Sequence, residues 1–253
     1  MSDLSGKVAL ITGAGQGVGQ GVALAMAAAG AAVVVTGRTL SKVETTAQMI
    51  KDRGGKALAL ACNVKSADDL AASVERTVAE FGGLDILVNN AQEVPLGKLE
   101  DVTDEAFIAG FESGPLATHR LMKFARPHLA KSGQGTIFNF CSSAGIRWDM
   151  TGYGAYAAVK QAIRSLTRAA AAEWGREGIR VLTIAPHAES PGLKYWVETR
   201  PKEAEEFFKT IPLGRIGKLE EDIGRALVAL CGQDLGYLTG ATIPLDGGQA
   251  NFD

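Results

Sequence analysis

The sequence predicts an α/β fold, in which a doubly wound parallel sheet of seven strands is covered by helices on both faces. Three observations point to it. Short apolar runs alternate with helical patterns, a glycine-rich turn follows the first run, and no repeat, linker or change of composition divides the 253 residues. We therefore expect a single domain, residues 1–253, with strand order 3-2-1-4-5-6-7. The expected strands are residues 7–11, 32–36, 56–62, 85–89, 136–141, 180–185 and 242–245.

The first three helices are marked by turns, caps and apolar spacing. Residues 17–29 follow the glycine-rich turn, and Ser41 is expected to cap a second helix that ends near Gly54. A third helix is expected over residues 66–81. Its apolar side chains recur at helical spacing, at Leu70, Val74, Val78 and Phe81.

Two longer helical stretches, residues 103–131 and 153–176, separate the later strands. Pro115 should kink or interrupt the first of them, because proline removes a backbone hydrogen-bond donor. Residues 187–211 are the least regular segment of the chain, and we expect a lid or substrate loop there.

Charge and composition exclude several classes of protein. With 26 basic and 28 acidic residues, nothing favours a nucleic-acid or membrane partner. The apolar residues 22–35 contain Gly30 and predict a helix, a turn and a strand rather than a membrane span. Residues 1–6 lack the pattern of a signal peptide, so a cytoplasmic protein is expected. Its three cysteines should be reduced core residues, namely Cys62, Cys141 and Cys231.

The glycine-rich turn has the spacing of a phosphate-binding loop. It follows an expected strand and opens a helix. Gly13 permits the turn, Gly17 allows the backbone to approach a pyrophosphate, and Gly19 allows close packing. The helix N-terminus then offers amide donors and a favourable dipole to the phosphates.

Tyr156 and Lys160 are the residues most indicative of chemistry. Four positions apart on a helix, their side chains share one face. An ammonium beside a phenol favours the phenolate, so we expect the pKa of Tyr156 to be lowered from ~10 towards neutrality. Such a phenol would give and take protons at physiological pH.

Together with Asn89-Asn90-Ala91 and Ser142, these motifs resemble the short-chain dehydrogenase/reductase family, of the type with about 250 residues. The resemblance covers nearly the whole chain. It implies a Rossmann-type fold and an NAD(P)(H)-dependent oxidoreductase that interconverts an alcohol and a ketone. In that family a tyrosine exchanges the hydroxyl proton, a lysine supports it and contacts the nicotinamide ribose, and a serine holds the substrate oxygen.

For the cofactor, the resemblance implies contacts from many of the residues already named and from several others. The second strand ends at Gly37-Arg38, where an acidic residue would favour NAD. The Arg38 guanidinium suits a 2′-phosphate, so NADP is expected, with NAD possible. The implied cofactor-binding residues are Gly13, Gln16, Gly17, Val18, Gly19, Arg38, Asn63, Val64, Asn90, Ala91, Tyr156, Lys160, Pro186 and His187.

The implied catalytic residues are Ser142, Tyr156 and Lys160. Two serines compete for the first role. The register of the preceding strand favours Ser142, whereas the family's commonest interval to the tyrosine favours Ser143. We choose Ser142, because a strand fixes register more tightly than a loop does. Ser143 should then cap or satisfy backbone at the strand end.

The chain departs from the family pattern at four positions. Gly114 stands where many relatives carry an asparagine that helps to hold a water in the proton relay. Gln92 replaces a glycine, Thr183 an asparagine and His187 a glycine. These changes suggest a reshaped pocket, in which His187 contacts substrate or cofactor and titrates near neutral pH, or else faces solvent.

Two alternatives to a fully active dehydrogenase follow from those departures. One is a catalytically weakened cofactor-binding protein that acts as a subunit or regulator. The other is a non-redox, dehydratase-like use of the same pocket. The intact Tyr156–Lys160 pair counts against the first.

The expected partner is a small carbonyl or alcohol substrate, and no metal site is expected. A substrate wall is proposed from flanking aromatic and apolar residues, namely Trp148, Met150, Tyr153, Tyr195 and Trp196. The resemblance also implies a homotetramer or homodimer, paired through the long helices at residues 103–131 and 153–176.

Overall fold

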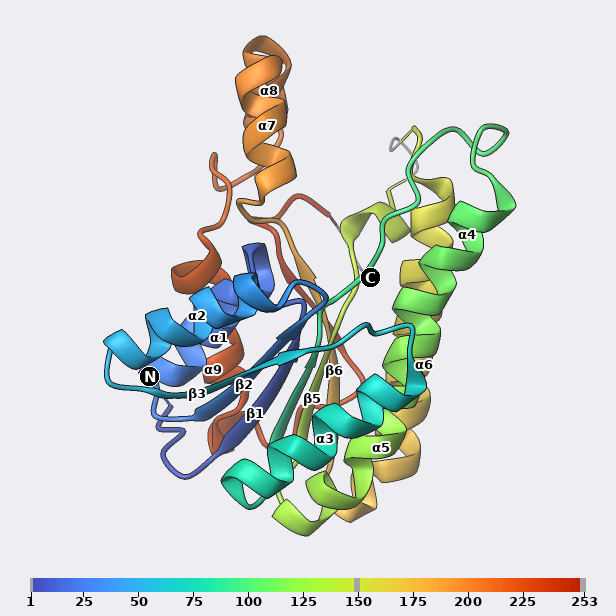
Figure 1. Cartoon of the computed structure of the whole chain (residues 1–253). Coiled ribbons are helices and arrows are strands. Elements are labelled where there is room, and N and C mark those ends of the chain that lie inside the picture. The colour runs from blue at the N-terminus through green and yellow to red at the C-terminus, as the bar shows by residue number, and fades with distance from the viewer. Residues whose placement is uncertain (1, 148–150, 251–253) are drawn as a thin grey trace.

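A parallel sheet of seven strands forms the centre of the molecule (Figure 1). The computed structural model describes residues 2–147 and 151–250. The strand order β3-β2-β1-β4-β5-β6-β7 confirms the predicted fold class and topology. The strands are β1 Val8–Thr12, β2 Ala32–Gly37, β3 Lys56–Ala61, β4 Ile86–Asn89, β5 Thr136–Phe140, β6 Arg180–Pro186 and β7 Thr242–Leu245.

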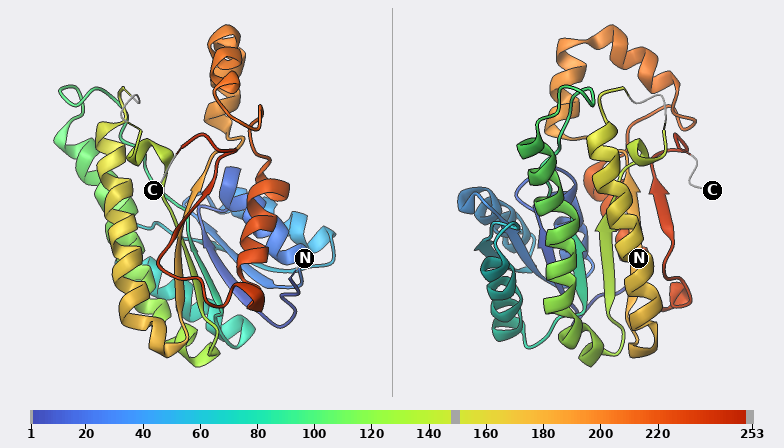
Figure 2. Two further views of the ribbon diagram at one scale, coloured as in Figure 1. Left: turned by 180° about the vertical axis from the view of Figure 1, so that it is seen from behind. Right: turned by 90° about the vertical axis from the view of Figure 1, so that its right-hand side faces the viewer.

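Helices cover both faces of the sheet. Successive side chains of a strand point to opposite faces, so an apolar strand needs cover on both. Ile11 packs into the apolar core on the side of α1 and α9, whereas its neighbour Leu10 packs on the side of α3 and α5. Figures 1 and 2 show α1, α2 and α9 on one face and α3, α5 and α6 on the other. The α-helices are α1 Gly17–Ala28, α2 Leu40–Asp52, α3 Ala67–Phe81, α4 Asp104–Phe111, α5 Ala117–Ser132, α6 Gly154–Trp174, α7 Pro191–Thr199, α8 Pro201–Lys209 and α9 Arg225–Leu230.

Several short helical turns complete the chain. Three are 3₁₀ turns, η2 Ser143–Gly145, η3 Gly175–Glu177 and η5 Gln233–Leu235, and two are π turns, η1 Glu112–Leu116 and η4 Leu219–Gly224. Among the described residues, no helix combines the length and apolar character needed to cross a lipid bilayer.

Pro115 interrupts the predicted helix at residues 103–131, as expected. The chain forms α4, then the π turn η1 around the proline, then α5. Because proline has no N–H, the regular hydrogen-bond ladder cannot continue through it. The wider turn buries Ser113 and Gly114 against the site, which is where π bulges are often found.

Two expectations about local structure are wrong. Thr39, not Ser41, precedes the first residue of α2, and Ser41 lies inside the helix. Residues 187–211 are not irregular but contain α7 and α8, which project beyond the sheet (Figure 1). The sequence does not predict these two helices, because their prolines suggest irregular structure. Each proline occupies a first helical position, where its missing N–H costs no bond.

A buried polar chain fastens α6 to the centre of the sheet. Asn89 Nδ2 on β4 donates to Asn139 Oδ1 on β5 at 2.8 Å, and Asn139 Nδ2 donates to Thr167 Oγ1 on α6 at 2.9 Å. All three side chains are buried, so each bond is costly to break. The network fixes how α6 presents its N-terminal residues to the carboxyl edge of the sheet.

Candidate active site

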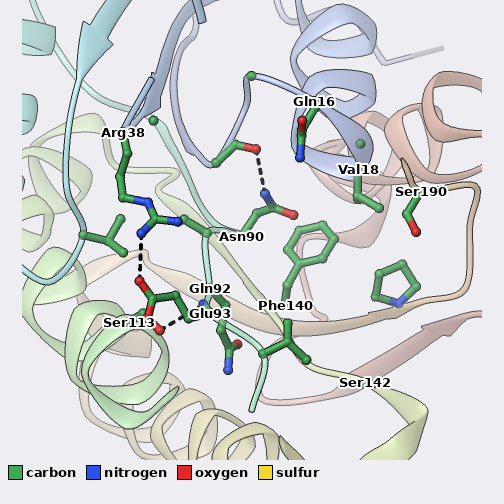
Figure 3. A pocket seen from close by; sticks show the side chains of 18 of the residues that line it. Gln16, Val18, Arg38, Asn90, Gln92, Glu93, Ser113, Phe140, Ser142 and Ser190 are labelled. Carbon is green, nitrogen blue, oxygen red and sulfur yellow. Dashed lines mark hydrogen bonds and ion pairs between the residues drawn. The ribbon is translucent and has the colours of Figure 1, made fainter. Parts of the chain in front are cut away.

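A cavity of about 600 Å³ opens at the carboxyl ends of the strands, where the loops after β1 and β4 diverge. Figure 3 shows part of its wall. Of the residues predicted for the site, the cavity is lined by Gly13, Gln16, Gly17, Val18, Arg38, Asn63, Val64, Asn90, Ala91, Ser142, Tyr156, Lys160, Pro186 and His187. The structure therefore brings together fourteen residues from parts of the sequence that lie far apart. Their roles in binding and catalysis remain predictions.

The glycine loop has the shape of an anion cradle. Gly13 and Gly17 adopt φ values of +65° and +60°, which other residues rarely adopt. A Cβ on Gly13 would lie 2.9 Å from the Cα of Ala91. Among the described residues, no side chain caps the N-terminus of α1, and its first turn carries no acidic residue. Amide donors and the positive end of the helix dipole therefore face the cavity.

Gly19 lies beneath the loop and not in the cavity wall. A Cβ there would sit 2.5 Å from the Gly13 carbonyl oxygen and 2.6 Å from Asn90 Nδ2. The residue thus allows α1 to pack against the loop, which is the role the spacing predicted for it. Any contribution to cofactor binding would be indirect.

Thr12 and Asn90 join the ends of β1 and β4. Thr12 Oγ1 accepts hydrogen bonds from the backbone N–H groups of Asn90 and Ala91, at 3.0 and 3.1 Å. In return Asn90 Nδ2 donates to the carbonyl oxygen of Thr12 at 2.9 Å and to that of Gly13 at 3.2 Å. Figure 3 shows one of these bonds as the dashed line at Asn90. The floor of the cavity is consequently fixed from both strands.

Cations gather at the end of the cavity beside β2 and α2. Arg38 forms an ion pair with Glu93 at 2.9 Å (Figure 3). Lys65 approaches the same carboxylate at 3.4 Å. Lys42 Nζ donates to Gln16 Oε1 at 3.1 Å. The sequence reasoning missed Lys42, Lys65 and Glu93. The position of Lys42, four residues after Arg38 and in the first turn of the helix that follows it, was the available signal.

The end of β3 forms a compact turn beside these cations. Asn63 donates its backbone N–H to Asp69 Oδ2 at 2.8 Å, and its side-chain oxygen accepts from the N–H of Lys65 at 3.2 Å. Val64 is 9% exposed and completes an apolar part of the wall.

Lys160 and Tyr156 project from the first turns of α6 into the opposite part of the cavity. Lys160 is buried, and its Nζ donates to the carbonyl oxygen of Phe140 at 2.8 Å. Burial lowers the pKa of this amine to about 8. The Nζ lies 5.4 Å from the centre of the Tyr156 ring.

Tyr156 does not show the lowered pKa that the sequence predicted. Burial raises its pKa to about 12, and the hydrogen bond to Ser142 offsets this in part. The phenol is therefore neutral at physiological pH in this structure, and suits a proton donor better than a base.

Ser142 is the serine that faces Tyr156. It lines the cavity and bonds to the phenol, whereas Ser143 begins the turn η2. The expectation that Ser143 would satisfy backbone at this point is wrong. Ser142 Oγ itself accepts the N–H of Ala144, at 3.2 Å, because Ser142 is the residue in extended conformation before the turn.

His187 is half-buried in the cavity wall and does not face solvent. Its Nδ1 is buried without a hydrogen-bond partner among the described residues, and its ring meets Phe207 edge-on at 5.3 Å. Burial lowers the pKa of the imidazole, Asp246 opposes that shift, and Arg147 adds to it. The lowered pKa favours the neutral imidazole, and the Nδ1 atom is left without a hydrogen-bond partner among the described residues.

Of the residues proposed for a substrate wall, Tyr153, Tyr195 and Trp196 are described, and none of the three lines the 600 Å³ cavity, so the wall stays a prediction. Trp196 packs edge-on against Phe207 at 5.5 Å, and Tyr153 packs edge-on against Tyr156 at 6.3 Å. Tyr195, by contrast, is 69% exposed. Trp148 and Met150 lie outside the described residues.

The cysteines are free thiols. Cys62 and Cys141 are buried and Cys231 is half-buried, broadly as predicted. Burial raises the pKa of Cys141 to about 11, so the thiol beside Ser142 is protonated and unreactive at neutral pH. Within residues 2–147 and 151–250, no three His, Cys, Asp or Glu side chains cluster as metal ligands would.

Comparisons of sequence and of structure both match this chain to proteins described as reductases or dehydrogenases. A family model described as enoyl-(acyl carrier protein) reductase matches residues 13–250. The 12α-hydroxysteroid dehydrogenase of a Clostridium species is 39% identical over 256 residues, which cover 98% of each chain. A 2,5-dichloro-2,5-cyclohexadiene-1,4-diol dehydrogenase of Sphingobium indicum is 33% identical over 98% of each chain. A crystal structure described as that of a "putative short-chain alcohol dehydrogenase" from Sinorhizobium meliloti 1021 superposes with a TM-score of 0.91. It is 35% identical and covers 98% of this chain and 97% of its own.

The buried Lys160 predicts a pH-dependent stability. The folded protein releases the Lys160 proton near pH 8, whereas the unfolded chain releases it near 10.5. Below pH 8 both states bind the proton, and the buried ammonium lowers the free energy of unfolding. Between pH 8 and 10.5 the unfolded state binds more protons, so the free energy of unfolding rises with pH, by at most about 1.4 kcal/mol per pH unit.

Urea denaturation of the wild type and of Lys160→Met between pH 7 and 9.5 measures this effect. Every other titrating group is common to both proteins, so the difference in free energy of unfolding isolates Lys160. We expect the wild type to gain about 1–2 kcal/mol relative to the variant above pH 8. A difference that stays constant with pH would show that Lys160 does not titrate in this range.

Proposed function

Because the chain belongs to the short-chain dehydrogenase/reductase family, we propose that it interconverts an alcohol and a ketone by hydride transfer. The observation that carries the proposal is the meeting of Ser142, Tyr156 and Lys160 in the same cavity as the glycine loop. A bound nicotinamide dinucleotide would supply or accept the hydride.

In this proposal the proton is transferred by Tyr156 of α6, with the help of Lys160 on the same helix and of Ser142, which follows β5. Tyr156, neutral and bonded to Ser142, donates its proton to the carbonyl oxygen in the direction of reduction. Ser142 holds that oxygen in place. Lys160, fixed by the Phe140 carbonyl, keeps a positive charge near the phenol and stabilises the phenolate that forms. The burial of Lys160 strengthens this interaction.

The dinucleotide fits the opposite half of the cavity. The positive φ values of Gly13 and Gly17, and the close approach of Gly13 to Ala91, leave room for a pyrophosphate and for no side chain. We propose NADP as the preferred cofactor, because Arg38 and Lys42 place two cationic side chains beside the end of β2. Glu93 competes for Arg38, which keeps NAD in consideration.

We propose a cyclic secondary alcohol, or its ketone, as the substrate class. Two of the relatives are dehydrogenases of a hydroxysteroid and of a cyclohexadiene diol. In this chain His187, which lines the cavity, and Trp196 both pack edge-on against Phe207, so an aromatic cluster adjoins the cavity. The weakened cofactor-binding protein is less well supported, because the proton-transfer residues are all present.

We also propose that copies of the chain pair through α4 and η1. Phe107, Ile108 and Leu116 are 38%, 54% and 38% exposed on this surface. An apolar patch of this kind is typical of an interface between subunits.

Fluorescence titration with NADPH and NADH tests the cofactor assignment. NADPH should bind more tightly, and Arg38→Ala should weaken NADPH binding by about tenfold, because a charge-assisted hydrogen bond is lost, while NADH binding changes little. Arg76→Ala, on the exposed face of α3, is the matched control. Tighter binding of NADH would overturn the NADP assignment, and binding of neither would contradict the proposed function.

Tyr156→Phe tests the chemistry itself. The variant keeps the ring but cannot donate a proton, so kcat for ketone reduction should fall by at least about 100-fold while the Kd for NADPH stays within about twofold. Tyr237→Phe alters a fully exposed phenol and should leave kcat unchanged. Full-rate reduction by Tyr156→Phe would rule out the mechanism.

A further inference from the structure

The Glu93 carboxylate is shared by two cationic side chains at the end of the cavity beside β2. Its Oε1 lies 2.9 Å from Arg38 Nη1 (Figure 3). Lys65 Nζ lies 3.4 Å from Oε1 and 3.4 Å from Oε2 of the same carboxylate. Arg38 follows β2, Lys65 follows β3 and Glu93 follows β4. The charge of one carboxylate is thus divided between cations from two separate segments of the chain.

A ligand phosphate that reaches Arg38 has to compete with Glu93. Both residues line the cavity, and Arg38 is the group that we propose for the 2′-phosphate of NADP. A guanidinium binds a phosphate most strongly when two of its N–H groups are free to donate in parallel. A bound 2′-phosphate would also bring negative charge close to the Glu93 carboxylate, and like charges repel. Binding of NADP therefore requires the Arg38–Glu93 ion pair to open.

The three side chains differ in their freedom to move. The Arg38 side chain is 66% exposed, whereas those of Glu93 and Lys65 are 31% and 30% exposed. The Glu93 N–H donates to Ser113 Oγ at 3.0 Å, and the Lys65 carbonyl oxygen accepts from Arg120 Nη1 at 3.1 Å. Because exposed ion pairs contribute little free energy, Arg38 can leave Glu93 readily, while Lys65 stays beside it.

We propose that Glu93 is a specificity-determining residue, which holds Arg38 in an internal ion pair until a 2′-phosphate displaces it, and that Lys65 then neutralises the Glu93 charge. The proposal rests on the proposed function. NADP exchanges one anionic partner of Arg38 for another, so its phosphate adds less affinity than Arg38 alone would give. NAD has no 2′-phosphate and leaves the pair closed. Glu93 thus narrows the preference for NADP, and Lys65 limits this effect.

Glu93→Gln tests the first part, because glutamine keeps the size of the side chain and removes its charge. In fluorescence titrations the Kd for NADPH should fall about fivefold, while the Kd for NADH changes less than about twofold. A misfolded variant would lose affinity, so it cannot imitate this gain. Glu177→Gln removes a carboxylate of similar exposure, paired with Arg126 at the opposite edge of the sheet, and should change neither Kd.

Lys65→Met tests the second part, because methionine keeps an unbranched apolar side chain and removes the ammonium. Glu93 is then left with Arg38 as its cation, so it should hold Arg38 more firmly and repel a phosphate more strongly. The Kd for NADPH should rise about fivefold, and that for NADH should change less than about twofold. Lys7→Met is the matched control. The Lys7 side chain is 32% exposed and pairs with Asp85 at the other end of the strands.

The double variant Glu93→Gln/Lys65→Met distinguishes an indirect role of Lys65 from a direct one. Without the carboxylate there is no charge for Lys65 to neutralise. Adding Lys65→Met to Glu93→Gln should therefore change the Kd for NADPH less than about twofold. If Lys65 instead binds the phosphate itself, the same substitution would weaken NADPH binding equally in both backgrounds, and that result would overturn the role given to Lys65.

Two other results would overturn the role of Glu93 and leave the proposed function standing. One is an unchanged Kd for NADPH in Glu93→Gln. The other is weaker binding of NADH by that variant, which would show that the carboxylate accepts hydrogen bonds from the ribose itself. Failure of the wild type to bind either nucleotide, by contrast, would contradict the proposed function.

Discussion

The hydrogen bonds between Thr12 and Asn90 are the constraint on which the site depends. They tie the end of β1 to the end of β4, at the point where the order of the strands reverses. One side of this junction shapes the glycine loop, and the other directs the chain into Gln92 and Glu93. The glycine loop and the loop after β4 therefore share one wall of the cavity, where we propose that the nucleotide binds.

The second half of the site depends on α6. The buried Asn89–Asn139–Thr167 chain places this helix on the sheet, and the Phe140 carbonyl receives the Lys160 amine. Such groups are costly to bury without partners, so their pairing restricts α6 to one position. Beside the cavity the fold leaves the Gln92 amide and His187 Nδ1 buried without hydrogen-bond partners among the described residues.

Local patterns in the sequence predict most of the fold, because buried parallel strands are apolar runs and the glycine turn has fixed spacing. They also predict which residues reach the cavity, since the carboxyl ends of parallel strands meet at one edge. Local patterns do not predict features that depend on contacts between residues far apart in the sequence. The packing of Gln92 on Gly114, the convergence of Arg38 and Lys65 on Glu93, and the burial that raises the pKa of Tyr156 all depend on contacts across the chain.

We propose, above all, that a hydride passes from a nicotinamide nucleotide to a ketone in this cavity while Tyr156 supplies the proton. The most direct measurement uses NADPH that carries deuterium at both C4 positions, a panel of cyclic ketones and mass spectrometry of the products. The account predicts an alcohol with one deuterium on the carbinol carbon, formed in step with oxidation of the nucleotide. An unlabelled product, or loss of the ketone without oxidation of NADPH, would contradict it.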